Sequence, residues 1–156
     1  MLNIDIPGYT TLRLEHLVLD YNGTLALDGE LMDGVKERLV RLAGDMRVHV
    51  LTADTFGHAR SRLEAVDCLF HLIGKGDQAL AKAEYVKGLG AQNCVSVGNG
   101  RNDALMLETS ALGIGLIQVE GGAVSALNSA DIICTNINHA LDLLLSPLRI
   151  TATLRS

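Results

Sequence analysis

Residues 16–24 read HLVLDYNGT, and this stretch decides the fold. The apolar run 17–19 leads directly into Asp20, and Gly23 and Thr24 follow in a loop. A short apolar run without alternation is typical of a strand that is buried on both faces of a parallel sheet. Ligands of such sheets collect beyond the carboxyl ends of the strands, so we expect Asp20 to face a ligand.

Short apolar runs and helical patterns alternate along the rest of the chain. Residues 2–6 and 11–17 alternate apolar and polar side chains about Pro7-Gly8, which predicts an N-terminal hairpin. Five further strands are expected at 46–52, 67–73, 93–98, 112–117 and 131–135. Helices are expected at 33–43, 55–66 with Asp54 as N-cap, 78–89, 102–110, near Ala123, and finally at 139–146, before Pro147.

Repeated strand-then-helix units predict an α/β fold with three layers, a mainly parallel sheet and helices on both of its faces. We expect one domain over residues 1–156, with the hairpin in 1–15 and a catalytic core in 16–146. About thirty residues separate Asp20 from Thr52, and about thirty more separate Thr52 from Lys82. Neither interval has room for an inserted cap domain, so the site should be open.

Composition excludes several classes of function. The chain has 156 residues, of which 48% are apolar, and a formal net charge of -5. This acidic balance offers no basic stripe for nucleic acid. No apolar run approaches the roughly 20 residues that cross a bilayer, and the N-terminus lacks the features of a secretory signal. We therefore expect a cytoplasmic protein that binds neither nucleic acid nor membrane.

Four reactive residue types fall at strand ends or helix starts. Asp20 ends one strand and Thr52 ends the next, Lys82 lies near the start of a helix, and Asp103 opens another helix after VGNGRND. A carboxylate nucleophile, a hydroxyl, an ammonium and a second carboxylate are the groups that phosphoryl transfer through an aspartyl phosphate requires. Lys75 is the alternative lysine, and spacing favours Lys82.

These motifs resemble those of the haloacid dehalogenase superfamily, and within it the soluble relatives of the P-type ATPase phosphorylation domain. Asp20-Tyr21-Asn22-Gly23-Thr24 is similar to the Asp-x-Asp-x-Thr of the superfamily and the Asp-Lys-Thr-Gly-Thr of the pumps. Thr52-Ala53-Asp54 resembles Thr-Gly-Asp, and residues 98–103, GNGRND, resemble Gly-Asp-Gly-x-Asn-Asp. Lys82 matches the lysine of the pumps.

The resemblance implies a Mg²⁺-dependent phosphatase of this fold without a cap, and it assigns roles residue by residue. Asp20 attacks phosphorus, and Asn22 occupies the place of the acid and base. The phosphoryl group is bound by Gly23, Thr24, Thr52, Ala53 and Lys82. Mg²⁺ is held by the Asp20 carboxylate, the Asn22 backbone carbonyl, Asn99 and Asp103.

Two departures from the pattern bear on activity. Asn22 stands where the phosphatases have the aspartate that exchanges protons, and Asn99 stands where an aspartate usually lies near the metal. We therefore expect a slow phosphohydrolase that favours activated substrates such as acyl or aryl phosphates. The alternative is a weakly active or inactive module that binds Mg²⁺ and phosphate for regulation. A phosphorylation-receiver domain is disfavoured, because a single acid follows the first core strand.

The substrate expected from this pattern is a phosphorylated small molecule or a phosphorylated macromolecule. An open site must be shielded from water by the loop at residues 25–31, by a second subunit or by the substrate itself. A homo-oligomer is one such arrangement, and the sequence gives no residue that proves it.

Overall fold

A six-stranded parallel sheet forms the centre of the molecule in the computed structural model, which describes residues 1–53 and 58–156. Its strands follow the order β10-β9-β8-β3-β6-β7, and every neighbouring pair is parallel. The strands are β3 (His16–Asp20), β6 (Arg47–Thr52), β7 (Cys68–Leu72), β8 (Cys94–Gly98), β9 (Leu112–Leu116) and β10 (Ile132–Cys134). The expected parallel sheet is confirmed.

Strand β3 lies between β6 and β8, and all five of its residues are buried. From β3 the chain first adds β6 and β7 on one side and then β8, β9 and β10 on the other. The connections therefore reverse direction at β3. Ligands bind at such a switch point, outside the carboxyl ends of the strands, and Asp20 is the last residue of β3.

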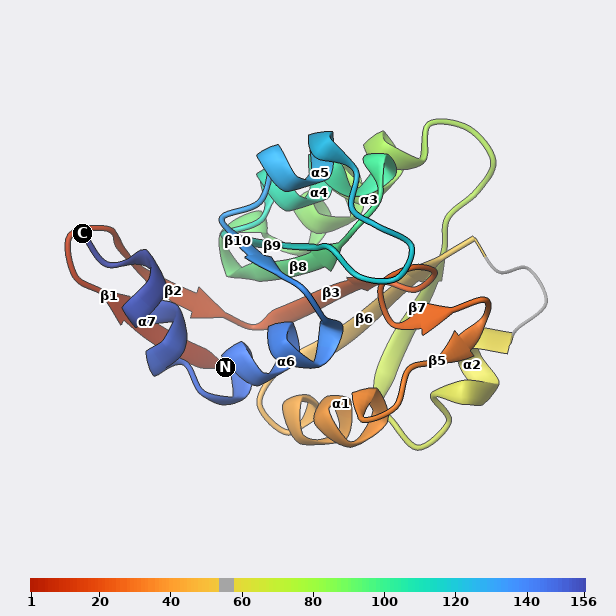
Figure 1. Ribbon diagram of the computed structural model, residues 1–156, viewed down its shortest axis with the longest axis horizontal. Coiled ribbons are helices and arrows are strands. Elements are labelled where there is room, and N and C mark those ends of the chain that lie inside the picture. The colour runs from red at the N-terminus through yellow and green to blue at the C-terminus, as the bar shows by residue number, and fades with distance from the viewer. Residues whose placement is uncertain (54–57) are drawn as a thin grey trace.

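Helices cover both faces of the sheet, as Figure 1 shows. Helices α1 (Val35–Ala43), α2 (His58–Arg62) and α6 (Ile137–Leu145) pack on the face with the larger apolar cluster. Helices α3 (Gln78–Leu89), α4 (Ala104–Thr109) and α5 (Val124–Asn128) lie on the other face. Short 3-10 helices, η1 (Ala91–Asn93) and η2 (Arg101–Asp103), precede β8 and α4.

The expected N-terminal hairpin is present as β1 (Leu2–Ile6) and β2 (Thr10–Leu14). A last helix, α7 (Leu148–Leu154), packs against it, and Thr151 Oγ1 donates to Asp5 O at 3.0 Å. The expectation that residues 139–146 form the last helix is therefore wrong, because Pro147 ends α6 and then occupies the N-cap position of α7, where its missing N–H is not needed. In Figure 1 the hairpin and α7 lie beyond the end of the sheet at which β3 begins.

The loop expected after Asp20 contains a small hairpin of β4 (Ala26–Leu27) and β5 (Glu30–Leu31). Asp28 and Gly29 form its turn, both with positive φ, as two-residue hairpin turns require. Residues 21–46 hold only this hairpin and α1, so no cap domain is inserted there. Helix α2 is shorter than expected, and Asp54, its expected N-cap, lies outside the described residues.

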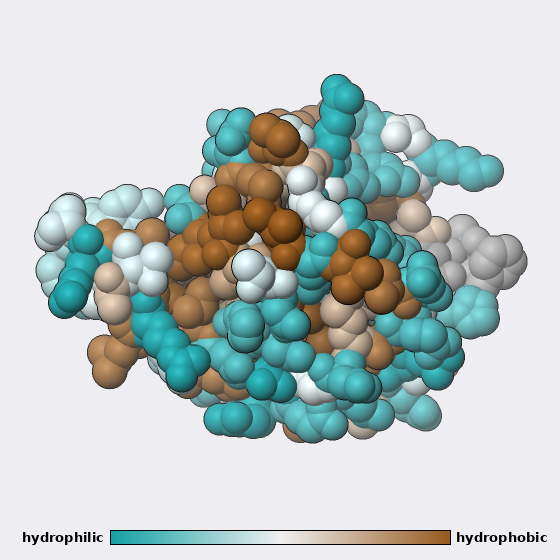
Figure 2. All heavy atoms as spheres, viewed as in Figure 1, coloured by the Kyte–Doolittle hydropathy of each residue, from teal (hydrophilic) through white to brown (hydrophobic). Residues whose placement is uncertain are grey.

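Polar side chains cover the outer face of α1 in Figure 2, whereas apolar side chains gather around β9 and β10 in the middle of the same view. Ile117 and Ile133 are exposed large apolar residues of this region. In the described part of the chain, no helix is long and apolar enough to cross a membrane.

Candidate active site

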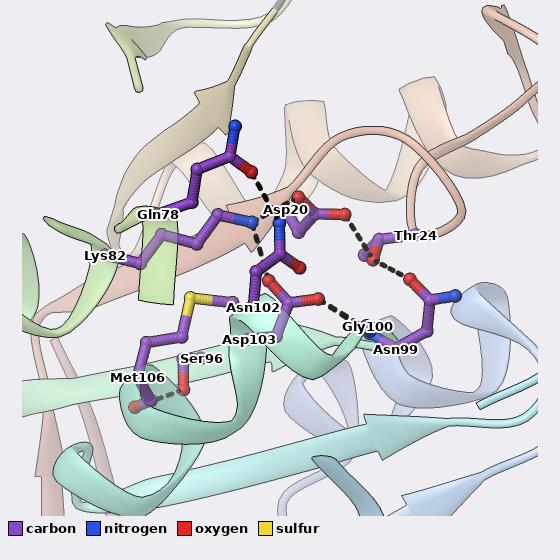
Figure 3. Close-up of polar contacts among 10 residues, drawn as sticks. All are labelled: Asp20, Thr24, Gln78, Lys82, Ser96, Asn99, Gly100, Asn102, Asp103 and Met106. Carbon is purple, nitrogen blue, oxygen red and sulfur yellow. Dashed lines mark hydrogen bonds and ion pairs between the residues drawn. The ribbon is translucent and has the colours of Figure 1, made fainter. Parts of the chain in front are cut away.

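A buried ammonium group lies between two carboxylates at the carboxyl end of β3. Lys82 Nζ is 2.6 Å from Asp20 Oδ1 and 2.6 Å from Asp103 Oδ1. Figure 3 shows the Lys82 side chain reaching from α3 toward both acids. The residues come from three separate parts of the chain, and the sheet topology brings them together as the sequence predicts.

Helix α3 places Lys82 by burying one face. Asp77 caps the helix by accepting a hydrogen bond from Leu80 N at 3.0 Å, and Ala83 and Val86 are buried beside Lys82. Only 3% of Lys82 is exposed, whereas Lys75 lies on the surface before the helix. Of the two candidate lysines, the fold therefore directs Lys82 to the site.

Asp103 is fully buried at the junction of η2 and α4. Its Oδ2 accepts from Asn99 N at 3.1 Å and from Gly100 N at 2.8 Å, which leaves Oδ1 for Lys82. A β-carbon on Gly98 would lie 2.5 Å from Asp103 Cγ, so the close approach of strand β8 to this acid requires glycine. The glycines and amides of the GNGRND stretch thus fix the orientation of Asp103.

The second Asp20 oxygen is held from the opposite side. Thr24, which is fully buried, donates from Oγ1 to Asp20 Oδ2 at 3.1 Å. Thr24 Oγ1 also lies 3.5 Å from Asn99 Oδ1, at the outer limit of a hydrogen bond. Figure 3 shows Thr24 and Asn99 on the side of Asp20 away from Lys82. Both carboxylate oxygens of Asp20 are therefore oriented by neighbouring side chains.

Burial and a neighbouring carboxylate raise the pKa of Asp20. Burial is the largest cause and the nearby Asp103 carboxylate is the second, and together they raise the pKa of Asp20 to about 7 despite Lys82. Burial lowers the pKa of Lys82, but Asp20 and Asp103 outweigh it, so that pKa is raised. The two acids carry more negative charge than one ammonium neutralises.

The other residues expected at the site lie along the same edge. Thr52 ends β6, which pairs with β3, and it is 7% exposed; Ala53 follows it on the surface. Asn22 is exposed in the loop after Asp20. These residues therefore lie near the end of β3, and their catalytic roles stay predictions.

Gly23 and Thr24, which were expected to bind the phosphoryl group, use their backbone amides inside the loop. Gly23 N donates to Ala26 O at 2.8 Å, and Thr24 N donates to Tyr21 O at 3.3 Å. These bonds close the turn that follows β3, and Gly23 adopts a φ of 78° there. A phosphoryl group at Asp20 must therefore find donors elsewhere, for example in the Lys82 ammonium.

Sequence reasoning missed three polar residues near the site. Gln78, the first residue of α3, accepts from Asn102 Nδ2 at 2.9 Å and links α3 to the GNGRND stretch. Gln118 and Glu120 follow β9 and reach the loop after β3. Gln118 and Glu120 lie in a turn that matches no phosphatase motif, so only the folded chain reveals their position.

The donor set fits a hard divalent cation. In the part of the chain described, no three His, Cys, Asp or Glu side chains converge as a metal site. Two carboxylates and neutral oxygens suffice for Mg²⁺, because it keeps several waters and takes one or two carboxylates. After burial, the Asp103 carboxylate is the second cause that raises the pKa of Asp20, and a divalent cation would offset this negative charge. Asp20, Asp103 and the Asn99 amide oxygen are the side-chain donors at hand.

Two proteins of Methanocaldococcus jannaschii are similar to the chain in sequence. The uncharacterized protein MJ0073 is 39% identical over 84 residues, which are 51% of this chain and 90% of that protein. The uncharacterized protein MJ0072 is 49% identical over 39 residues, which are 25% of this chain and 89% of that protein. No protein-family model matches the chain.

Solved structures of phosphatases share the fold over nearly the whole chain. The cobalt-bound deoxy-D-mannose-octulosonate 8-phosphate phosphatase of Haemophilus influenzae has a TM-score of 0.71 at 14% identity and covers 92% of this chain and 94% of its own. The Moraxella catarrhalis 3-deoxy-D-manno-octulosonate 8-phosphate phosphatase, in complex with magnesium ion, phosphate ion and its sugar, has a TM-score of 0.66 at 17% identity, covering 91% and 94%.

A P-type pump contains the same fold as one part of a larger chain. A zinc-transporting PIB-type ATPase in its E2.Pi state has a TM-score of 0.63 at 24% identity, and the match covers 78% of this chain and 20% of the pump. Phosphatases and pump thus share the fold on which Asp20, Lys82 and Asp103 come together here. The chain belongs to the same family as MJ0073, and it shares the fold of these phosphatases and of the pump.

Proposed function

We propose that the protein is a Mg²⁺-dependent phosphohydrolase that forms an aspartyl phosphate at Asp20. The observation that carries this proposal is the buried cluster in which Lys82 Nζ lies 2.6 Å from both Asp20 Oδ1 and Asp103 Oδ1 at the switch point of the sheet. A buried ammonium beside a carboxylate at the switch point of the sheet suits a reaction that brings an anion to that carboxylate. The similarity to phosphatase structures supports the same reaction class.

In the proposed reaction, an Asp20 carboxylate oxygen attacks the phosphorus of a phosphate ester or acyl phosphate. The bond from phosphorus to the leaving oxygen breaks, and the phosphoryl group is transferred to Asp20. A water molecule then attacks the same phosphorus, inorganic phosphate leaves, and the Asp20 carboxylate is regenerated. Lys82 and the Thr52 hydroxyl bind the phosphoryl oxygens and stabilise the charge that they carry in the transition state.

A magnesium ion, when bound, supplies the positive charge that lets an anionic nucleophile approach an anionic substrate. The Asp20 carboxylate, the Asn22 backbone carbonyl, Asn99 and Asp103 would hold it. Thr24 keeps the Asp20 carboxylate in place through its 3.1 Å hydrogen bond, and the amides of Asn99 and Gly100 do the same for Asp103.

We propose that Asn22 makes the hydrolysis of ordinary phosphate esters slow. An amide does not exchange the proton that an alkoxide leaving group needs, and general acid-base catalysis is worth about 10²- to 10⁴-fold in rate. The enzyme should therefore be slow on alkyl phosphates and faster on acyl or aryl phosphates, whose leaving groups depart without a proton. We propose these as its substrate class, either small or as part of a macromolecule.

Water must be excluded from an open site by something besides a cap domain. The hairpin β4–β5 is short, and Val119, in the turn after β9, exposes 75% of its surface. We infer that the substrate itself or a second copy of the chain covers this mouth. We further propose that the protein acts in the cytoplasm.

A regulatory module that binds phosphate and Mg²⁺ without turnover is the second candidate. The observation that favours it is the use of Asn99 as a structural residue, because its Nδ2 donates to Gly121 O at 3.1 Å. An aspartate carboxylate has no donor for this bond. The loss of both carboxylates, at Asn22 and Asn99, is what a binding protein that has given up hydrolysis would show.

Phosphoenzyme trapping separates the two candidates. The full chain would be incubated with ³²P-labelled acetyl phosphate and Mg²⁺, quenched in acid and counted, alongside D20N and an exposed control, D28N. The wild type and the control D28N should incorporate label transiently and release inorganic phosphate. D20N should neither incorporate label nor release phosphate. Binding of phosphate without label or turnover would establish the module instead.

A further inference from the structure

A tight turn after β9 brings a third carboxylate to the mouth of the site. Gly121 N donates to Gln118 O at 2.7 Å, and Gly121 has a φ of 79°, so the chain reverses within residues 118–121. Figure 1 shows the segment between β9 and α5 beside the loop that follows β3. Glu120 is the only acid of this turn.

Hydrogen bonds from three directions hold the turn in this place. Gln118 Nε2 donates to Gly23 O at 2.7 Å and to Thr24 O at 2.8 Å, and Gln118 Oε1 accepts from Ile137 N at 2.9 Å. Asn99 Nδ2 donates to Gly121 O at 3.1 Å. The position of Glu120 is therefore set by the site loops themselves, unlike that of a glutamate on a free surface turn.

The Glu120 carboxylate and the Asn99 amide both lie close to Gly23. A β-carbon on Gly23 would lie 2.6 Å from Glu120 Oε2 and 2.9 Å from each of Asn99 Oδ1 and Nδ2. The absence of a side chain at Gly23 thus leaves room for both groups at the same place. A negative charge sits next to the neutral residue that occupies the usual place of an acid.

A carboxylate here opposes phosphate binding unless a cation is present. Asp20 and Asp103 already outnumber Lys82 in charge, and Glu120 adds to the negative potential of the mouth. Among the described residues, the Glu120 carboxylate makes no hydrogen bond that holds the turn. A purely structural role therefore does not explain why a carboxylate lies here. An attracted cation gives the placement a physical reason.

We propose that Glu120 supplies the negative charge that Asn99 lacks and thereby gives the site its affinity for Mg²⁺. Glu120 acts as a nearby charge, because it does not converge with two other acids as a direct ligand set in the described chain. Gln118 acts as a positioning residue that keeps the carboxylate against the loop. This inference rests on the Mg²⁺ site of the proposed function and adds a residue to it.

Magnesium affinity measured without turnover tests the inference. Kd for Mg²⁺ would be determined by titration calorimetry on the full chain, and the rise of Tm with Mg²⁺ would be measured in parallel. E120Q should bind about 10-fold more weakly, in line with the effect of losing residues that support a metal site without ligating it. E108Q, which removes an exposed acid of α4, is the matched control and should bind like the wild type.

A second substitution makes the test specific for charge. If Glu120 compensates for Asn99, then N99D in the E120Q background should restore the affinity that E120Q loses. Equal Kd values for wild type and E120Q, including no detectable binding by either, would overturn the inference, as would a double variant no better than E120Q. Phosphoenzyme trapping at saturating Mg²⁺ tests the proposed function separately. If Asp20 is labelled and E120Q binds Mg²⁺ with the Kd of the wild type, the proposed function stands and only the role of Glu120 is rejected.

Discussion

The Lys82 ammonium lies 2.6 Å from the Asp20 carboxylate, although 62 residues separate them in the sequence. Lys82 is 3% exposed and Asp20 is 8% exposed, so water screens this pair weakly. Asp103 completes the cluster on the other side of the ammonium. The stability of the fold and the proposed chemistry therefore depend on the same three groups.

Replacing Lys82 by methionine should destabilise the protein strongly. K82M leaves two buried carboxylates without their cation, and breaking a buried pair in this way costs about 3–5 kcal/mol. K87M on the same helix is the control, because Lys87 makes only an exposed ion pair with Glu84, worth about 0–1 kcal/mol. Urea unfolding of both variants measures the difference. Equal losses of stability would show that the buried cluster is not held by Lys82.

Exchanging Asn22 for aspartate should raise activity selectively. N22D supplies the missing acid and base, so turnover of an alkyl phosphate should rise by about 10²- to 10⁴-fold, while turnover of acetyl phosphate changes little. Steady-state rates on both substrates give the measurement. Intact mass must confirm that the wild type is not deamidated, because Asn22 precedes Gly23. An equal gain on both substrates would assign Asn22 a different role.

Alanine at Gly23 should disturb the site far more than alanine at Gly29. Both glycines have a similar positive φ, 78° and 82°, so the backbone strain of about 1–2 kcal/mol is common to both variants. Only at Gly23 would the new methyl group meet other atoms, those of Glu120 and Asn99. G23A should therefore lose more stability in urea and bind Mg²⁺ more weakly than G29A. Matching behaviour would mean that nothing crowds Gly23.

A buried histidine should make stability depend on pH. His49 lies between His16, whose Nδ1 is 3.0 Å from His49 Nε2, and Tyr85, whose hydroxyl is 2.9 Å from His49 Nδ1. Burial, with smaller contributions from His16 and Arg47, lowers the pKa of His49 from 6.5 to about 4. Between these pH values the unfolded chain binds a proton that the folded chain does not.

Stability should therefore fall as pH decreases from about 6.5 to about 4, by at most about 1.4 kcal/mol per pH unit from this histidine. The comparison is urea unfolding of wild type and H49Q across that range, with H139Q, an exposed histidine, as the control. Relative to the wild type, H49Q should gain stability as pH falls from about 6.5 to about 4, and the difference between the two should be constant at higher pH. A difference that is independent of pH would assign the titration to other groups.

The sequence predicts the sheet and the central cluster because both follow from local patterns. Apolar runs that end in Asp20 and Thr52 indicate parallel strands, and carboxyl ends of adjacent parallel strands meet at one edge. Spacing alone favours Lys82 over Lys75, and burial in the fold agrees with it. The roles of these residues in catalysis stay predictions.

The parts that the sequence does not predict depend on long-range contacts. Helix α7 follows Pro147 directly and is stabilised by packing on the N-terminal hairpin, which no local pattern reveals. Gln118 and Glu120 gain their position from hydrogen bonds to a loop nearly a hundred residues away. The amides of Gly23 and Thr24 close their own turn, and only the three-dimensional path of the loop shows this.

The central claim is that the Asp20 carboxylate becomes phosphorylated. The most direct measurement treats the full chain with acetyl phosphate and Mg²⁺, reduces any acyl phosphate with borohydride, and identifies the changed residue by peptide mass spectrometry. Residue 20 should be converted to homoserine when Mg²⁺ is present, and this conversion should be absent in D20N. Conversion of another acid such as Asp103, or no conversion while phosphate is released, would contradict it.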